Sequence, residues 1–425
     1  MDTQASAPGC PFRLDPTAAD IHAEADLLRA HGPAAWVELP GGVQAWSVTD
    51  PGLIRRLLTD PRVSKDAHRH WPAYISGEIP QRWPLRIWVD VRNALTAYGD
   101  EHTRLRRLIA TAFSARRVRA LRPAIEEITD NLLDQLEAAA DAQGVADLRD
   151  HFAWVLPLQV VNTLLGVPDH MHDAFRSTVG GLFATGLTEE EAMQTGIAVY
   201  QLLADLVAAK RRTPGDDVTS GLIQAHDTET DSRLSEQELL DSLLLLIGAG
   251  HETTVNLITH AVVNLLTHPA QLALIRNGSA TWEDAAEETL RHQAPIATII
   301  MRFAIEDIHD PDTGHLFRKG DAIAINYAAA GRDPALHGED VDRFDITRTA
   351  RRDHLAFGYG AHFCLGAELA RLEARIALPA LFARFPDLAL AVPADQLRPL
   401  PSFISNGHEQ IPVILRTTPV TAAAA

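Results

Sequence analysis

The sequence predicts a mainly helical fold with a smaller β-rich part. Apolar residues recur with helical spacing over most of residues 100–292 and again over residues 364–385. Stretches that favour strands are limited to three regions, residues 34–48, 296–326 and 400–416. No linker-like segment interrupts the 425 residues, and a hydrophobic content of 46% is sufficient for a substantial core. We therefore expect one domain over residues 1–425.

The bulk composition restricts the class of function. A formal net charge of -18 argues against nucleic acid or an anionic membrane as the main partner. The two cysteines, Cys10 and Cys364, are too far apart for a disulfide framework or a Cys-x-x-Cys metal site, which favours a reducing compartment. The sequence also lacks a signal-peptide pattern and a long apolar run. It therefore predicts a soluble cytoplasmic protein without a membrane anchor.

Short elements are expected in the N-terminal part. Residues 11–32 have the spacing of a short amphipathic helix, and residues 34–48 alternate around a Pro-Gly-Gly turn as a hairpin does. A further helix is expected from Asp50 to Leu58. Residues 71–88 are rich in aromatics and proline without a sustained period, which is typical of a loop that covers or binds something. The alternative is a surface loop packed on its own aromatics.

Helices dominate the middle of the chain. Glu101 to Arg107 opens a basic helix, on which His102 and Arg106 share one face that could clamp a carboxylate. An ordinary solvated basic face is the alternative. Further helices are predicted over residues 117–140, 148–165 and, in two pieces around glycines 180, 181 and 186, residues 170–212.

The longest predicted helix begins at a capping box, Ser235-x-x-Glu238, and ends before Pro269. Its roughly 30 residues would span about 45 Å. Its middle is unusual, because an all-apolar stretch leads directly into Gly-Ala-Gly-His-Glu-Thr-Thr, residues 248–254. This part of the helix must be buried although it carries an acid and two hydroxyls.

Two interpretations account for these polar residues. Burying them costs several kcal/mol unless they are satisfied or used, and the glycines leave a gap beside them. Such a gap suits a small molecule bound at a metal. Alternatively, Thr253 donates to the carbonyl of Ala249 and Glu252 pairs with an arginine.

Mixed elements follow the long helix. Residues 282–292 predict a helix with an ordinary Glu–Arg pair three residues apart, and residues 294–302 are apolar and β-prone. A turn-rich hairpin is expected within residues 314–326. Asn406-Gly407 predicts a last hairpin that ends at Leu415.

A loop from His354 to Arg371 places one cysteine at the start of a helix. Phe357 is followed by two glycines that allow a tight turn, and helix formers begin at Ala367, so Cys364 lies near a helix N-terminus. Backbone N–H groups there favour an anion, which predicts a thiolate. A thiolate without a second cysteine nearby indicates a single metal–sulfur bond, for which haem iron is the known case. The alternative is a buried free cysteine.

The loop resembles the haem-binding signature of the cytochrome P-450 family, in the segment Phe357-Gly-Tyr-Gly-Ala-His-Phe-Cys-Leu-Gly366. Further matches occur in the family's order from His102 to Arg371, and weaker similarity covers nearly the whole chain. Parts of the N-terminal half are similar to soluble actinobacterial relatives that hydroxylate steroids or macrolides. The implied fold places haem between the long central helix and the cysteine-bearing loop.

The resemblance also implies the site residues. Cys364 would be the axial ligand of haem b, iron protoporphyrin IX. Glu252 would relay protons and Thr253 would hydrogen-bond the bound oxygen. The remaining cofactor-binding residues would be His102, Arg106, Ala249, Gly250, Arg302, Phe357, Gly358, His362 and Gly366. The expected substrate pocket contains Trp88, Phe183, Ala249, Ile299 and Ile300.

Scaffold and lid residues follow from the same resemblance. Glu288 and Arg291 would form a structural pair, joined by Arg348, that fixes the fold around the haem-bearing loop. The two helices within residues 170–212 would form a mobile lid over the pocket. Gly331 stands where relatives have Asn, so we expect one side-chain hydrogen bond to be lost there without a change in chemistry.

The implied reaction is monooxygenation of a small lipophilic substrate with O2. Because the chain lacks a Gly-x-Gly-x-x-Gly fingerprint, electrons would come from a separate ferredoxin and ferredoxin reductase, docked near the basic residues of 104–119. A steroid-sized polycyclic substrate is favoured, with a macrolide as the second candidate. Two other classes stay open, a haem carrier or gas sensor that does no catalysis and a cysteine hydrolase with His362 as its base.

Overall fold

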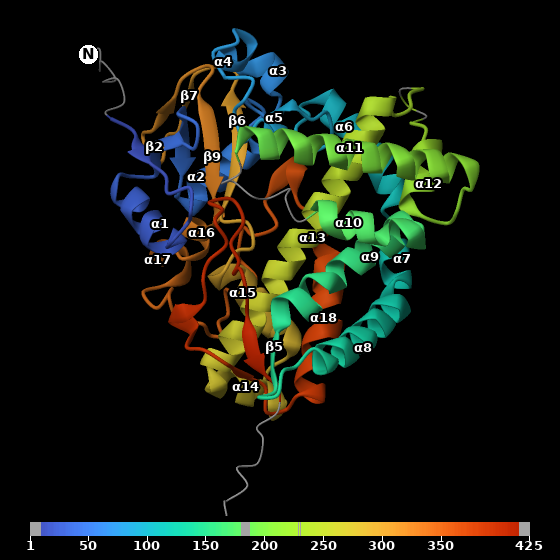
Figure 1. Ribbon diagram of the computed structural model, residues 1–425. Helices are drawn as coiled ribbons and strands as arrows, with labels where there is room; N and C mark the ends of the chain where they lie inside the picture. The colour runs from blue at the N-terminus through green and yellow to red at the C-terminus, as the bar shows by residue number, and fades with distance from the viewer. Residues whose placement is uncertain (1–9, 180–187, 228, 230, 416–425) are drawn as a thin grey trace, which may run out of the picture.

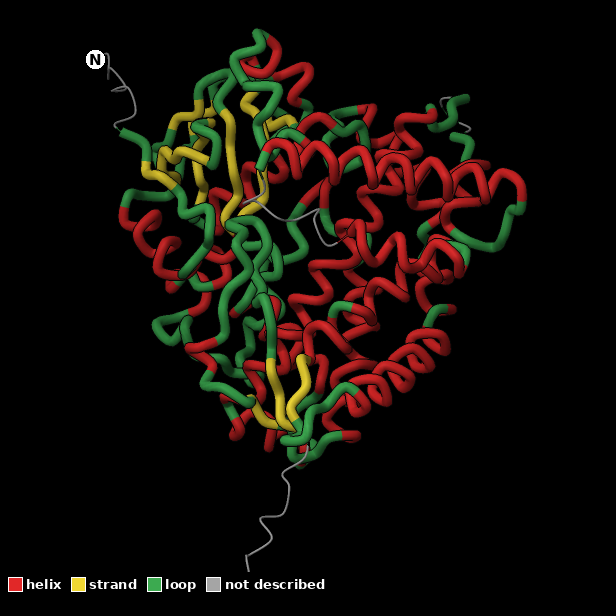
Figure 2. Tube along the Cα trace, in the orientation of Figure 1, coloured by secondary structure: helices red, strands yellow, loops and turns green. Residues whose placement is uncertain are grey.

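The strands lie mainly on one side of the molecule, and helices form the other side (Figure 1, Figure 2). The structure is a computed structural model that describes residues 10–179, 188–227, 229 and 231–415. This division confirms the predicted fold class, a mainly helical protein with a smaller β-rich part.

The largest sheet among the described residues has six strands in the order β1-β2-β3-β9-β6-β4. These strands are β1 (Phe12–Arg13), β2 (Ala34–Leu39), β3 (Val43–Val48), β9 (Ala322–Asn326), β6 (Thr298–Ala304) and β4 (Val63–Ser64). β2 and β3 form the predicted antiparallel hairpin, with Trp36 opposite Trp46. Every residue of β9 is buried, because this strand is central and covered on both faces.

The hairpin predicted within residues 314–326 is wrong. β8 (Leu316–Phe317) pairs with β7 (Ile308–His309), whereas β9 joins the large sheet between β3 and β6. A turn between two strands does not decide whether they pair with each other. An all-apolar strand such as β9 is stabilised by burial on both faces, and only the middle of the large sheet provides that.

The prediction of a last hairpin is right at the turn and incomplete beyond it. The N–H of Leu400 donates to the carbonyl of Gly407 at 2.9 Å, so the segments on either side of the turn contact each other. Beyond the turn, β11 (Pro412–Ile414) lies between β10 (Ala389–Leu390) and β5 (Val145–Asp147) in a separate three-stranded sheet.

Helices account for most of the remaining described chain. Those in the N-terminal half are α1 (Ile21–Ala30), α2 (Pro51–Thr59), α3 (Ala67–His70), α4 (Pro72–Ile75), α5 (Ile87–Asp90), α6 (Asp100–Ala112), α7 (Ala115–Ala120), α8 (Arg122–Ala138), the π-helical turn η1 (Arg149–Ala153), α9 (Val155–Leu165), α10 (His172–Val179) and α11 (Glu189–Arg212). The others are α12 (Val218–Gln224), α13 (Glu236–Thr267), α14 (Pro269–Arg276), α15 (Trp282–His292), α16 (Tyr327–Gly331), α17 (Pro334–His337) and α18 (Ala367–Arg384). The two helices predicted around glycines 180, 181 and 186 are α10 and α11, and these glycines lie outside the described residues.

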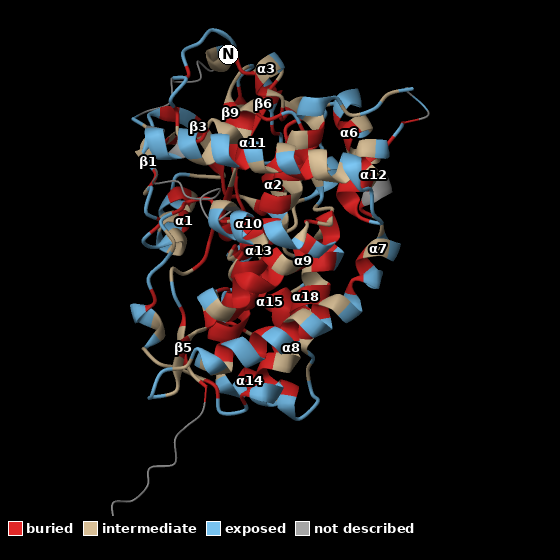
Figure 3. Cartoon of the chain, turned by 45° about the vertical axis from the view of Figure 1, so that its right-hand side comes forward, coloured by how far each residue is buried: buried red, intermediate tan, exposed pale blue. Residues whose placement is uncertain are grey.

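Helix α13 is the long helix that the sequence predicts, and it runs through the middle of the helical side (Figure 1). Both hydrogen bonds of the Ser235–Glu238 capping box are present, so the helix begins where predicted. α13 packs against α9, α15 and α18, and red, buried residues dominate this region in Figure 3. Because neighbouring elements cover most of its faces, its apolar residues are not restricted to the single stripe that is typical of a surface helix.

A fully buried ion pair joins the helices to the loops that follow. Glu288 and Arg291 in α15 are both 0% exposed, and their closest N–O distance is 2.7 Å. Nε of Arg348 lies 3.5 Å from the same carboxylate, which confirms the predicted third member of this group. Buried charges of this kind are tolerated when their hydrogen bonds are satisfied, and Arg291 also donates to the carbonyl of Val341 at 2.9 Å.

Gly331 has a steric role that the sequence did not predict. A Cβ atom at this position would lie 2.2 Å from the carbonyl oxygen of Arg291, so any side chain would push α16 away from α15. The departure from Asn is therefore linked to a close backbone approach, in addition to the expected absence of one side-chain hydrogen bond.

The length and apolarity of the described helices bear on whether any of them could cross a membrane. No single one of them is long and apolar enough to cross a membrane, and only the bent pair α13 and α14, with 101° between them, meets both criteria when taken together.

Candidate functional site

Cys364 lies at the end of a tight loop before α18. Its N–H donates to the carbonyl of Phe357 at 2.8 Å, which closes the loop. Gly358 and Gly360 have φ values of +72° and +69°, the left-handed region that favours glycine. A Cβ atom on Gly360 would lie 2.6 Å from the carbonyl oxygen of Leu58, so this glycine lets the loop approach α2 closely.

Two opposing effects act on the Cys364 thiol. Burial raises its pKa, while the N–H groups of Gly366 and Ala367 at the start of α18, together with Arg106 and Arg371, lower it. The net direction is upward, so the helix N-terminus does not by itself produce the predicted thiolate. A bound metal ion would reverse this balance, because coordination favours the deprotonated sulfur.

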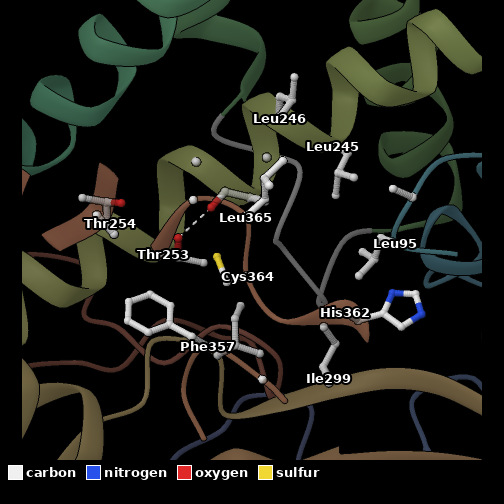
Figure 4. A pocket seen from close by; sticks show the side chains of 18 of the residues that line it. Leu95, Leu245, Leu246, Thr253, Thr254, Ile299, Phe357, His362, Cys364 and Leu365 are labelled. Carbon is white, nitrogen blue, oxygen red and sulfur yellow. Dashed lines mark hydrogen bonds between the residues drawn. The ribbon is translucent and has the colours of Figure 1, made fainter. Parts of the chain in front are cut away.

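A cavity of about 320 Å³ separates the cysteine loop from α13. Cys364 and Thr253 both line it, and Figure 4 shows both side chains in the same cavity together with Phe357 and Ile299. Its other walls are mostly apolar, with leucines from α13 on one side. A volume of this size and lining is typical of small-molecule sites.

The polar residues of α13 have partners within the protein. The Oγ1 of Thr253 donates to the carbonyl of Ala249 at 2.7 Å (Figure 4). An oxygen of Glu252 lies 3.3 Å from Nη2 of Arg149 in η1. The structure therefore has the arrangement that the sequence analysis gave as the alternative, a helix-bonded threonine and an acid paired with an arginine. Burial raises the pKa of Glu252, and Arg149 partly offsets this shift.

The neighbouring residues of α13 have packing roles. A Cβ atom on Gly250 would lie 3.1 Å from Cγ2 of Val161, so this glycine allows α9 to pack closely while it also lines the cavity. The ring of His251 bonds to the carbonyl of Trp154 at 2.8 Å. His251 is therefore a structural residue.

Basic side chains gather at one edge of the cavity. The rings of His102 in α6 and His362 in the cysteine loop are 4.1 Å apart, and Arg106 donates to the carbonyl of Phe363 at 2.7 Å. Arg302 in β6 is buried beside them. Burial and neighbouring cations lower the pKa of His362 far below its usual range, and burial lowers the pKa of His102.

This basic edge lacks an anion among the described residues. Neither Nη1 of Arg302 nor Nε2 of His102 has a hydrogen-bond partner there, although both atoms are buried. Buried donors of this kind are normally satisfied, so the geometry indicates a ligand with acceptor oxygens.

The donor set fits haem. Cys364 provides a sulfur on one side of the cavity, the walls are mostly apolar, and buried nitrogen atoms of Arg302 and His102 without hydrogen-bond partners among the described residues lie at one edge. A flat apolar ring with an iron at its centre and two carboxylates at its rim needs these three features. The predicted residues Phe357, Gly358 and Gly366 also line this cavity.

The predicted pocket residues fall into three groups. Trp88, Ala249 and Ile299 line the cavity. Ile300 does not, because adjacent side chains of a strand point to opposite faces, and it is fully buried in a cluster with Trp83 instead. Phe183 lies outside the described residues.

Sequence reasoning missed three polar residues near the site. Arg149 pairs with an acid that is distant in sequence, and no local pattern indicates this contact. Glu373 lines the cavity. It lies on the apolar side of α18, one residue after Leu372, and a charged residue at such a position could have indicated that it belongs to the site. Lys65 is buried next to Arg302, and no local pattern indicates this contact.

Comparison with known proteins leads to the same conclusion as the geometry of the cavity. The sequence profile described as Cytochrome P450 matches residues 282–396. The chain is 42% identical over 407 residues to the 2-hydroxy-5-methyl-1-naphthoate 7-hydroxylase of Streptomyces carzinostaticus, which covers 96% of this chain and 98% of that protein.

Solved structures agree with this relationship. CYP154A1 from Streptomyces coelicolor is 53% identical, with a TM-score of 0.88 and coverage of 95% of this chain and 100% of that chain. Testosterone-bound CYP154C4 from a Streptomyces strain is 43% identical, with a TM-score of 0.90 and coverage of 96% and 98%. The described fold, the cysteine loop and these similarities together show that the chain belongs to the cytochrome P450 family and is a cytochrome P450 monooxygenase.

Proposed function

We propose that this monooxygenase hydroxylates a lipophilic polycyclic substrate, with a steroid as the favoured class. The observation that carries the proposal is the mostly apolar cavity that extends from Cys364 past Ile299 and Trp88. Two of the similar proteins support it, because one is named for a naphthoate and the other was solved with testosterone bound, and both of these molecules have fused rings.

The residues at the basic edge orient the cofactor. Haem held through the sulfur of Cys364 would supply the oxygen activation that hydroxylation requires. His102, Arg106, Arg302 and His362 would hold its carboxylates, the two arginines through charge-assisted hydrogen bonds, and these carboxylates would provide the missing anion. The apolar walls exclude water from the ring and the substrate.

Helix α13 delivers protons to the opposite side of the cavity. Glu252 is buried and its pKa is raised, so its carboxyl group holds a proton more readily than an exposed acid does. Protons that Glu252 takes up are relayed towards Thr253, whose Oγ1 gives up its bond to the carbonyl of Ala249 and presents a proton to the cavity. Arg149 opposes protonation of Glu252, so the carboxyl group takes up a proton more readily when their ion pair opens.

Electrons arrive from a separate ferredoxin and its reductase in the cytoplasm. Several arginines in the predicted docking stretch are already paired, Arg104 with Glu238 and Arg107 with Asp227. Arg116 and Arg119 are exposed, and they would attract the acidic surface of a ferredoxin. The whole chain, residues 1–425, works as one domain in this proposal.

A spectrum tests the cofactor assignment. Purified protein, reduced and exposed to carbon monoxide, is expected to show the red-shifted Soret band of thiolate-ligated haem. The Soret band of the Cys364→Ser variant is expected to lack this red shift. A colourless wild-type protein would overturn the proposal. Turnover with a surrogate ferredoxin then separates an enzyme from a haem carrier or sensor.

A ligand panel tests the substrate class. Steroids and macrolides are titrated into the oxidised protein and scored by the spectral change that accompanies displacement of iron-bound water. We expect steroids to give the larger change. A response to macrolides alone would replace the steroid proposal with the second candidate.

A further inference from the structure

Lys65 occupies an unusual place at the end of β4. In the antiparallel pair of β4 and β6, Val63 lies opposite Ala304 and Ser64 lies opposite Phe303. Extended by one residue beyond the end of β4, this register would place Lys65 across from Arg302, and the two charges interact. Like charges that face each other across two strands repel, and here both side chains are also removed from water.

Both residues are buried. Lys65 is 3% exposed and Arg302 is 4% exposed. Lysine and arginine are almost never buried to this extent without an acidic partner. Among the described residues, no carboxylate forms an ion pair with either of them.

The neutral partners that are present do not compensate for two charges. Nζ of Lys65 lies 3.5 Å from the carbonyl oxygen of Ile300, a long contact for a hydrogen bond. Arg302 bonds to the hydroxyl of Tyr327, and its Nη1 has no partner among the described residues. Burial and the neighbouring Arg302 lower the pKa of Lys65 well below its usual range.

Lys65 also acts on the edge of the cavity. Arg302 and His362 both line the cavity, and Lys65 is buried beside Arg302. The site therefore contains one more cation than the sequence predicts. An anion placed at this edge would pair with it, and the protein itself provides none among its described residues.

We propose that Lys65 is a further cofactor-anchoring residue, whose ammonium group together with Arg302 neutralises a carboxylate of haem. The inference rests on the haem-thiolate function proposed above. It explains why a lysine is retained at a buried position beside an arginine. A buried charge pair of this kind slows dissociation of its partner more than it changes the rate of association.

The test measures haem release and apoprotein stability in the same variants. Lys65→Met removes the charge, and Lys319→Met makes the same substitution in an exposed turn as a control. Haem transfer from the oxidised holoprotein to excess apomyoglobin is expected to be about tenfold or more faster for Lys65→Met and unchanged for Lys319→Met. Lys65→Arg is expected to restore slow release at least in part.

The apoprotein should respond in the opposite direction. Lys65→Met removes an uncompensated buried charge, so the thermal midpoint of the apoprotein is expected to rise while haem is held less tightly. A purely structural lysine would lower that midpoint. Unchanged haem release, in Lys65→Met or in the more conservative Lys65→Gln, would overturn the inference. A normal carbon monoxide spectrum of the wild-type protein would show that the proposed function stands independently.

Discussion

The hydroxyl of Thr253 is held by its own helix, and the proposed mechanism requires this bond to break. It donates to the carbonyl of Ala249, the arrangement that a threonine in any helix can adopt. It lines the same cavity as Cys364, as its neighbour Thr254 does, but Thr253 is only partly buried whereas Thr254 is buried. The catalytic role proposed for Thr253 therefore depends on the access of its hydroxyl to the cavity and not on its hydrogen bond within the helix.

Substitution of Thr253 tests this role. We expect Thr253→Ala to bind haem and substrate normally but to convert a smaller fraction of consumed electrons into product, about tenfold or more lower, because proton delivery is lost. The ratio of product to consumed reductant measures this coupling. Thr259→Ala is a matched control, since Thr259 donates to its own helix at Val255 but is fully covered. Unchanged coupling in Thr253→Ala would contradict the assignment.

Glu373 is an acid on the cavity wall, and neither of its oxygens has a hydrogen-bond partner among the described residues. It is 1% exposed, and burial raises its pKa well above the usual range. The folded protein therefore keeps a proton that the unfolded chain releases above about pH 4.5. For this group the free energy of unfolding falls as pH rises from that value to the folded pKa.

Glu373→Gln should remove this pH dependence. We expect the variant to have a higher free energy of unfolding than the wild type, and this gain should be larger at about pH 8 than at about pH 5. The gain should grow by up to about 1.4 kcal/mol for each pH unit. Thermal or urea unfolding across this range measures the effect. Glu368→Gln, an exposed position of the same helix, is the control. An equal gain at both pH values would contradict the burial argument.

At the scale of elements, the π-helical turn η1 and the long helix α13 are joined by one ion pair. Arg149 and Glu252 have side chains that are 15% and 7% exposed, so little water screens them. Removal of one partner leaves the other charge buried without compensation. The free-energy cost of this unpaired charge is larger than the net stabilisation that the pair provides.

Arg149→Met should therefore destabilise the protein, by about 1 to 3 kcal/mol near neutral pH. Without Arg149, the pKa of Glu252 rises further, so the loss is small below the unfolded pKa of about 4.5 and grows as pH rises. Urea unfolding at two pH values measures this difference. The double variant Arg149→Met with Glu252→Gln should recover stability, and failure to recover would show that the pair is not the cause.

Side chains of the β6 strand face two different surroundings, the cavity and an apolar cluster away from it. Ile299 and Arg302 line the cavity, whereas Ile300 packs in an apolar cluster away from it. The register between β6 and β9 shifts between Ile299 and Arg302, and this irregularity allows both residues to reach the same side. Ile299 to Met301 are all apolar, so their pattern contains no information about which of them faces the site.

At the scale of the whole molecule, several histidines are buried and neutral. Burial lowers the pKa of His22 and His251 to about 4, and it lowers the pKa of His260 even further. His337 and His408 follow the same direction, with values of about 4. In the unfolded chain each of them would be protonated below about pH 6.5.

Acid should therefore destabilise this protein unusually early. Between about pH 6.5 and pH 4, the unfolded chain binds protons that the folded chain does not, so the free energy of unfolding falls by about 1.4 kcal/mol per pH unit for each such histidine. Chemical unfolding as a function of pH measures the slope. His260→Gln should reduce the slope, whereas His309→Gln at an exposed position should not. A flat profile down to about pH 5 would contradict this prediction.

The sequence by itself determined the features that depend on neighbouring residues. The mainly helical class, the start of α13 at its capping box, the β2–β3 hairpin and the loop that presents Cys364 are all confirmed. Helical spacing, caps and glycine-rich turns are local properties, so a single sequence contains them. The same local signature was sufficient to indicate the family to which the chain belongs.

Only the tertiary structure decided how distant segments meet. It placed β9 between β3 and β6, paired Arg149 with Glu252, turned Ile300 away from the cavity and put Lys65 beside Arg302. Each of these contacts joins segments that are far apart in the chain or depends on strand register. Burial of whole surfaces selects such contacts, and the free energy of that burial belongs to the assembled core rather than to any short stretch of sequence.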